Sequence, residues 1–81
     1  MTLEQQLLII TMEECGELVQ ACSKVLRHGQ TPAKMQQLVE EAGDVQVMLD
    51  LLMEHKYTTA WDIAERCDVK REKLAKWSDL L

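Results

Sequence analysis

The chain has 81 residues, of which 47% are hydrophobic and 28% are charged, and its net charge is −5. This length allows one domain, residues 1–81, and the hydrophobic content excludes an intrinsically disordered chain. The acidic balance argues against nucleic acid as a partner, although Mg²⁺ can bridge an acidic protein to a polyphosphate.

The first predicted element is a long helix that begins at Leu3. Thr2 can cap it, because a Thr side chain accepts a hydrogen bond from the backbone of the first turn. Apolar residues then recur at helical spacing as far as Leu26, and Gly29 is a natural stop. One long amphipathic helix is therefore expected over the first third of the chain.

A second long helix is predicted after a short loop. Thr31 and Pro32 form the pair of N-cap and first helical residue that is typical of a helix start. The helical pattern then runs to about Glu54. Because the loop is short, the two long helices are expected to pack antiparallel.

Two short helices are predicted in the C-terminal part of the chain. Thr59 can cap a helix over residues 60–66, and Asp68 can cap another from Val69 to about Leu80. No strand alternation competes with helix anywhere. The expected fold is all-α, with two long antiparallel helices and two short C-terminal helices. Long apolar stripes in so short a chain also predict a homo-oligomer.

The cysteines and the hydrophobic runs indicate where the protein resides. Cys15, Cys22 and Cys67 show no CxxC spacing, so we interpret them as small packing residues in a reducing compartment. No signal peptide is visible, and no apolar run approaches the length that spans a bilayer. A cytoplasmic protein without a membrane partner is expected.

A local repeat links the two long helices. Residues 13–18 (EECGEL) and 40–45 (EEAGDV) both read acid, acid, small, Gly, acid, aliphatic. A glycine inside a helix costs roughly 1 kcal/mol relative to alanine. Close approach of the two helix backbones would explain why both helices contain one.

Four acids of the repeat are expected to converge between the helices. At about 100° per residue, Glu14 and Glu41 each fall in the centre of the apolar stripe of their helix. Glu17 and Asp44 lie one turn later, about 60° to one side. Like charges crowded in a partly desolvated site are costly unless a cation binds there. Oxygen ligands at this spacing favour Mg²⁺, with Mn²⁺ as a substitute.

The paired motif also resembles a known family. Glu13-Glu14-x-x-Glu17, followed by Glu41-x-x-Asp44, is similar to the MazG-like all-α nucleoside triphosphate pyrophosphohydrolases, in particular their short stand-alone members. The resemblance covers about residues 3–55. It implies a four-helix module that assembles as a homodimer or a dimer of dimers. It also implies Mg²⁺-dependent hydrolysis of a nucleoside triphosphate to monophosphate and pyrophosphate, by attack of water at the α-phosphorus.

The same resemblance implies roles for individual residues. Glu14 and Glu41 would be both metal ligands and catalytic residues, and Glu13 would hold a ligand or orient the attacking water. The complete ligand set would be Glu14, Glu17, Glu41 and Asp44. Basic side chains would bind the substrate phosphates, and the candidates are Lys24, Lys70, Arg71 and Lys73.

Two alternatives remain open at this point. Residues 59–77 have the look of a helix-turn-helix with a basic second helix, which would make the protein a DNA-binding dimer. The acidic net charge and the paired acids speak against that function. The other alternative is a catalytically silent helical assembly module.

Overall fold

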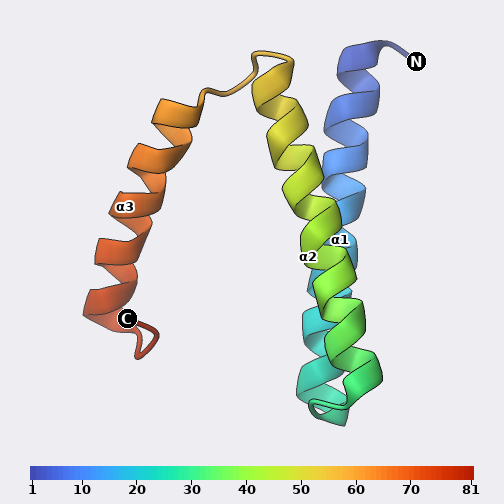
Figure 1. Cartoon of the computed structure of the whole chain (residues 1–81), viewed down its shortest axis with the longest axis vertical. Coiled ribbons are helices and arrows are strands. Elements are labelled where there is room, and N and C mark those ends of the chain that lie inside the picture. The colour runs from blue at the N-terminus through green and yellow to red at the C-terminus, as the bar shows by residue number, and fades with distance from the viewer.

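The computed structural model describes residues 1–81 as three helices and no strand (Figure 1). They are α1 (Leu3–His28), α2 (Pro32–Glu54) and α3 (Ala60–Trp77). The prediction of an all-α fold is confirmed. The two long helices begin at the predicted residues and end within two residues of the predicted ends.

Local hydrogen bonding explains where α1 begins and ends. The Thr2 hydroxyl accepts from the Gln5 backbone N–H at 3.1 Å, and the Gln5 side chain accepts from the Thr2 N–H at 2.9 Å. This reciprocal capping box satisfies two of the free amides of the first turn. At the other end, Gly29 has φ +85°, a conformation that glycine adopts without the steric cost of a Cβ.

The other two helices are also capped by threonine. The Thr31 hydroxyl accepts from the Lys34 N–H at 3.2 Å, and Pro32 occupies the first turn of α2. The Thr59 hydroxyl accepts from the Asp62 N–H at 3.1 Å at the start of α3. Three helix starts of the chain are thus encoded by one residue type at the N-cap.

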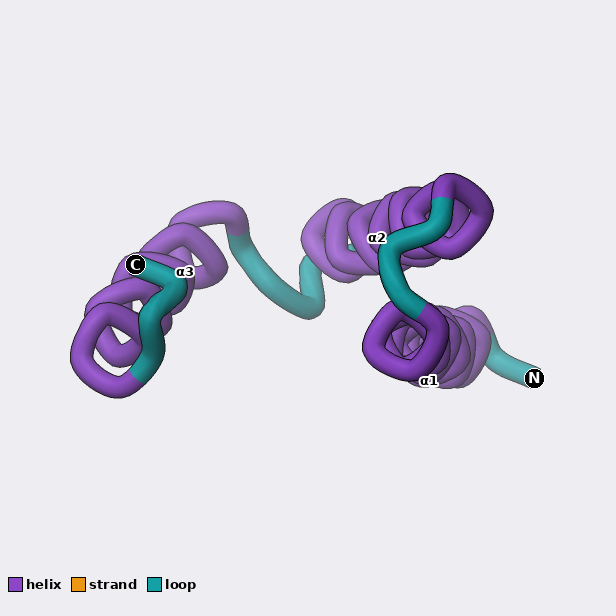
Figure 2. Tube along the Cα trace, turned by 90° about the horizontal axis from the view of Figure 1, so that it is seen from below, coloured by secondary structure: helices purple, strands orange, loops and turns teal.

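Helices α1 and α2 form an antiparallel hairpin, and they lie side by side in both views (Figures 1 and 2). The buried core of the whole chain is confined to this hairpin and consists of Leu7, Ala21 and Met48. These residues belong to the stripes that the sequence predicts to face each other. The hairpin is therefore the folded unit that positions the acids of the repeat.

The prediction of two short C-terminal helices is wrong, and with it the four-helix module. Residues 60–77 form one continuous helix, so Asp68 is a helix-interior residue rather than an N-cap. No glycine or proline interrupts this stretch, and a single Asp is too weak a breaker to end a helix. The helix-turn-helix alternative fails for the same reason, because the turn it requires is absent.

Helix α3 stands apart from the hairpin (Figures 1 and 2). None of its residues is buried. The connection leaves α2 through Lys56, which adopts a left-handed conformation with φ 68°. The chain as a whole measures 39 × 34 × 15 Å. It is therefore an open arch that is thin in its shortest dimension.

Two further expectations about packing are not met within the chain. The three cysteines are free, as expected, but all of them are exposed rather than packed. A Cβ built on Gly16 or Gly43 would meet no atom within 4 Å. The helices therefore do not approach closely at these glycines, because both point away from the contact between α1 and α2.

None of the three helices has the length and the apolar run that crossing a membrane requires.

Candidate metal centre

Three acids of the repeat come together at the middle of the hairpin. Glu14 of α1 and Glu41 and Asp44 of α2 each offer a carboxylate oxygen, and these oxygens lie within 4.8 Å of one another. Glu14 and Glu41 are half-buried, whereas Asp44 is exposed. The cluster is thus open to solvent on one side and backed by the helix contact on the other.

The packing of the hairpin explains why these side chains meet. Glu14 lies two turns after the buried Leu7 and two turns before the buried Ala21 on the same face of α1. Glu41 stands in the same relation to the buried Met48 on α2. Because these faces are in contact, the carboxylates are held where apolar side chains would otherwise pack. Asp44 joins them from the next turn of α2.

The electrostatics of the cluster are unfavourable for Glu41 in its charged form. Partial burial raises its pKa, and the negative charges of the neighbouring acids raise it further, in the order Glu17, Asp44, Glu14 and Glu40. No basic side chain is among the groups that act on it. The proton affinity of Glu41 is thus increased by desolvation and by uncompensated like charge.

The remaining predicted acids lie at the edge of the cluster. Glu17 is exposed and is not a member of the group of three, but its charge acts on Glu41. Glu13 is exposed and contributes no resolved effect on Glu41. Glu40 does act on Glu41, although it was not among the predicted site residues. The repeat could have identified it, because Glu40 occupies the position that corresponds to Glu13.

The donor set fits a hard divalent cation. Three carboxylates supply only oxygen ligands, and they come from two helices at i, i+3 spacing on α2. Mg²⁺ is usually held by only a few carboxylates together with other oxygen ligands, and the open side of the cluster leaves room for such ligands. A cation would also remove the like-charge repulsion that raises the pKa of Glu41.

The predicted phosphate-binding residues fall into two groups. Lys24 lies on α1, two turns beyond Glu17 on the same side of the helix, and is half-buried. The other three lie on α3, away from the acids of the same chain: Lys70, Arg71 and Lys73. Only Lys24 therefore belongs to the same helix hairpin as the acid cluster.

The α3 residues have surroundings of their own. The Lys70 ammonium lies 5.0 Å from the ring centroid of Trp77, within the range of a cation–π contact. Lys70 and Arg71 also line a hollow with apolar side chains, namely Cys67, Leu74, Leu80 and Leu81. Within one chain the structure does not bring these basic groups to the carboxylates.

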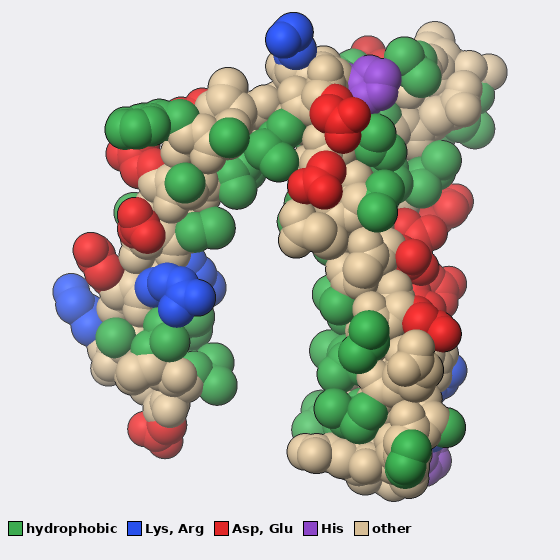
Figure 3. All heavy atoms as spheres, viewed as in Figure 1, with side chains coloured by type: hydrophobic (Ala, Val, Ile, Leu, Met, Phe, Trp, Pro, Cys, Tyr) green, Lys and Arg blue, Asp and Glu red, His purple; other side chains and the backbone are tan.

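The hairpin has a charged side and an uncharged side. Figure 3 shows acidic side chains along the edge of the hairpin that faces away from α3, and hydrophobic side chains along the edge that faces it. We call the charged side the acidic face, and we define it by the cluster of Glu14, Glu41 and Asp44 together with the two further acids that act on Glu41, Glu17 and Glu40. The acidic face is thus accessible to a ligand without movement of α3.

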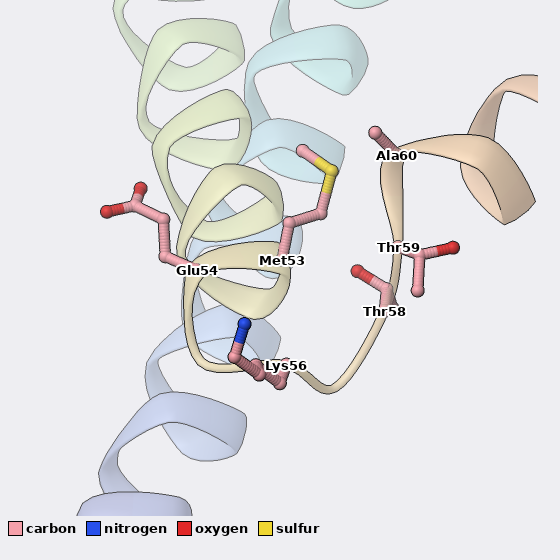
Figure 4. A pocket seen from close by; sticks show the side chains of 6 residues that line it. All are labelled: Met53, Glu54, Lys56, Thr58, Thr59 and Ala60. Atoms are coloured by element: carbon pink, nitrogen blue, oxygen red, sulfur yellow. The ribbon is translucent and has the colours of Figure 1, made fainter.

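The largest pocket of the chain lies elsewhere. It is a hollow of about 420 Å³ at the end of α2, and Figure 4 shows the six side chains that line it: Met53, Glu54, Lys56, Thr58, Thr59 and Ala60. They come from the last turn of α2, the connection and the first residue of α3. None of them is a predicted site residue, so the acid cluster remains the candidate site.

Comparison of the chain with known protein families, with curated proteins and with solved structures finds no match in any of the three.

Proposed function

We propose that this protein is an Mg²⁺-dependent nucleoside triphosphate pyrophosphohydrolase. The observation that supports this function is the meeting of Glu14, Glu41 and Asp44 oxygens within 4.8 Å on the acidic face. Like charges this close, two of them half-buried, are costly without a cation, and Mg²⁺ is the usual partner of a triphosphate. The motif resemblance given above points to the same activity.

The proposed reaction assigns a role to each residue of the site. Bound Mg²⁺ would neutralise phosphate oxygens and activate water for attack on the α-phosphorus. Glu14, Glu41 and Asp44 would hold the ion, and Glu17 would complete the set from the adjoining turn. Attack by water releases a proton, which a carboxylate of the site that is not engaged as a ligand would take up. Glu13 would hold a ligand or orient the water.

The basic residues would bind the phosphates from two places, one within the chain and one in another copy. Lys24 can act within the chain, because it lies on the same side of α1 as Glu17. Lys70, Arg71 and Lys73 would reach a phosphate only at the acidic face of another copy, since α3 lies on the opposite side of its own hairpin. The proposed enzyme is therefore a homodimer or a dimer of dimers.

The decisive experiment is a screen of the common nucleoside triphosphates with separate detection of pyrophosphate and orthophosphate. We expect a nucleoside monophosphate and pyrophosphate to form only with Mg²⁺ or Mn²⁺, and to stop with a chelator. Glu41→Gln should abolish the reaction while the helical content persists, because it removes a charged oxygen ligand but keeps the side-chain volume.

Glu65→Gln is the matched control, since it removes the same charge from an exposed position of α3. Its activity should equal that of the wild type. Orthophosphate as the first product, or pyrophosphate release that survives in Glu41→Gln, would contradict the proposal.

A further inference from the structure

The two helices of the hairpin are related by a local pseudo-two-fold axis that passes through the acid cluster. Glu41 follows Glu14 by 27 positions, and Asp44 follows Glu17 by the same number. Oxygens of Glu14 and Glu41 also meet in space, and α1 and α2 run antiparallel (Figure 1). The side of this axis toward the loop between α1 and α2, which we call the tip, can therefore be compared position by position with the other side, the open end.

Four positions of the helix contact flank the axis, two on each side. They lie seven residues, or about two turns, before and after the paired glutamates, and they are Leu7, Ala21, Lys34 and Met48. Three of them are the whole buried core of the chain, and the fourth, Lys34, is half-buried. Because the helices are antiparallel, Lys34 lies opposite the small side chain of Ala21. A lysine thus occupies the fourth core position.

Packing alone does not explain a lysine at this position. Its counterpart in the repeat is Leu7, which is 6% exposed, so an apolar side chain fits such a place. A lysine there loses hydration unless its ammonium reaches solvent or an anion. No basic side chain is among the groups that act on Glu41, so Lys34 does not compensate the acid on its own face of α2. Its charge is left for an anion from outside the chain.

The two sides of the axis also differ in charge. Residues 18–39, which include the tip, contain no acid and three basic side chains: Lys24, Arg27 and Lys34. Residues 1–12 and 46–54, which form the open end, contain no lysine or arginine and three acids: Glu4, Asp50 and Glu54. A polyanion held at the cluster is therefore attracted toward the tip and repelled from the open end.

Lys24 and Lys34 lie at neighbouring levels between the cluster and the tip. Lys34 precedes Glu41 by about 10 Å along α2, and Lys24 follows Glu14 by about 15 Å along α1. Side chains lean toward the N-terminus of their helix, so Lys24 leans toward the cluster and Lys34 toward the tip, which narrows this difference. Figure 3 shows a basic side chain at the acidic edge of the hairpin, between the acids and the tip.

We infer that Lys34, together with Lys24, binds the leaving pyrophosphate part of a metal-bound triphosphate, which lies along the hairpin with its terminal phosphate toward the tip. The inference rests on the proposed function and adds to it a binding residue and a direction. A lysine ammonium on its flexible stem is a suitable point charge for a terminal phosphate. The repeat places Leu7 and Leu51 at the corresponding positions of the open end, so that end offers no ammonium at these positions and is left to the nucleoside.

The test replaces a lysine by methionine, which keeps an unbranched side chain and removes the charge. Inorganic pyrophosphate in excess Mg²⁺ is titrated into the protein by calorimetry, so the readout needs no turnover. We expect Lys34→Met and Lys24→Met each to weaken binding roughly tenfold, the scale of one hydrogen bond to a charged group. Lys76→Met is the matched control, because Lys76 is exposed on α3 and has no assigned role. It should bind pyrophosphate as the wild type does.

The outcomes separate this inference from the proposed function. Pyrophosphate that binds Lys34→Met as tightly as the wild type would overturn the inference, even in an active enzyme. Equal weakening in Lys76→Met would do the same, because the effect would then be one of net charge. Binding that depends on Lys34 in a protein that hydrolyses no triphosphate would support the phosphate site and contradict the proposed function.

Product inhibition of the active enzyme tests the direction. Lys34→Met should raise the inhibition constant of pyrophosphate by the same factor and leave that of the nucleoside monophosphate unchanged, because the nucleoside lies at the other end. An equal rise for both products would contradict the direction.

Stability distinguishes a binding role of Lys34 from a structural one. Without Mg²⁺ and pyrophosphate, Lys34→Met should unfold at the same urea concentration as the wild type or a higher one, because an apolar side chain replaces a half-buried ammonium at a core position. A lower midpoint would show that Lys34 holds the hairpin together, and the inference would then fail.

Discussion

At the scale of single residues, Glu41 links the packing of the hairpin to the chemistry of the acidic face. It is half-buried because it occupies a position of the apolar stripe, and its pKa is raised by that burial and by the acids around it. A raised pKa means that the folded protein takes up a proton more readily than the unfolded chain does. The charged form of Glu41 therefore opposes folding at neutral pH when no cation is bound.

A pH titration of stability tests this coupling. In the absence of metal, the contribution of Glu41 should make the folded protein more stable as the pH falls from neutral through its raised pKa, with no further gain below the ordinary carboxyl pKa. Glu41→Gln should remove this slope, and Glu65→Gln should keep it. The measurement is the midpoint of urea unfolding at a series of pH values. A slope shared by all three proteins would show that Glu41 is not its source.

The sequence predicted the acids of the site better than its basic residues. The helical repeat places Glu14, Glu41 and Asp44 by simple rotation, because all three lie within regular helices that contact each other. Lys70, Arg71 and Lys73 depend on where α3 lies in space. That position is determined by the connection through Lys56, whose left-handed conformation no helical pattern indicates.

At the scale of helices, threonine caps and a proline determine most of the boundaries. Thr2, Thr31 and Thr59 each cap a helix with the predicted hydrogen bond. The exception is the predicted break near Asp68, where an aspartate that resembles an N-cap lies inside α3. An N-cap residue is effective only when the preceding residues leave the helical conformation, and nothing before Asp68 forces them to do so.

Val69→Pro distinguishes one helix from two. Proline is tolerated in the first helical position, which Val69 would occupy if Asp68 were an N-cap. Inside the continuous α3 it removes a backbone hydrogen bond and clashes with the preceding turn, at a cost of about 3 kcal/mol. We therefore expect Val69→Pro to lower the helical ellipticity through loss of helix in α3 alone, while the hairpin keeps its helices. Ellipticity equal to that of the wild type would mean that the chain has two helices here, with a boundary at Asp68.

At the scale of the whole molecule, the chain is a thin arch with little interior. Three of 81 residues are buried, and all three belong to the hairpin. Ordering the backbone costs roughly 1–2 kcal/mol per residue, which so small a core does not offset. An 18-residue helix such as α3, without packing, is also only marginally stable in water. The homo-oligomer proposed above would supply burial that the single chain lacks.

Thermal stability should accordingly depend on protein concentration. If folding and association are coupled, mass action raises the unfolding midpoint as the concentration increases. We expect the wild type to show this rise over about a hundredfold range of concentration, followed by circular dichroism. Val19 of α1 is 68% exposed in the single chain. Val19→Lys should unfold at a lower temperature that is independent of concentration, because a lysine at this apolar position disfavours association. A wild-type midpoint that is the same at all concentrations would mean that one chain is stable with three buried residues.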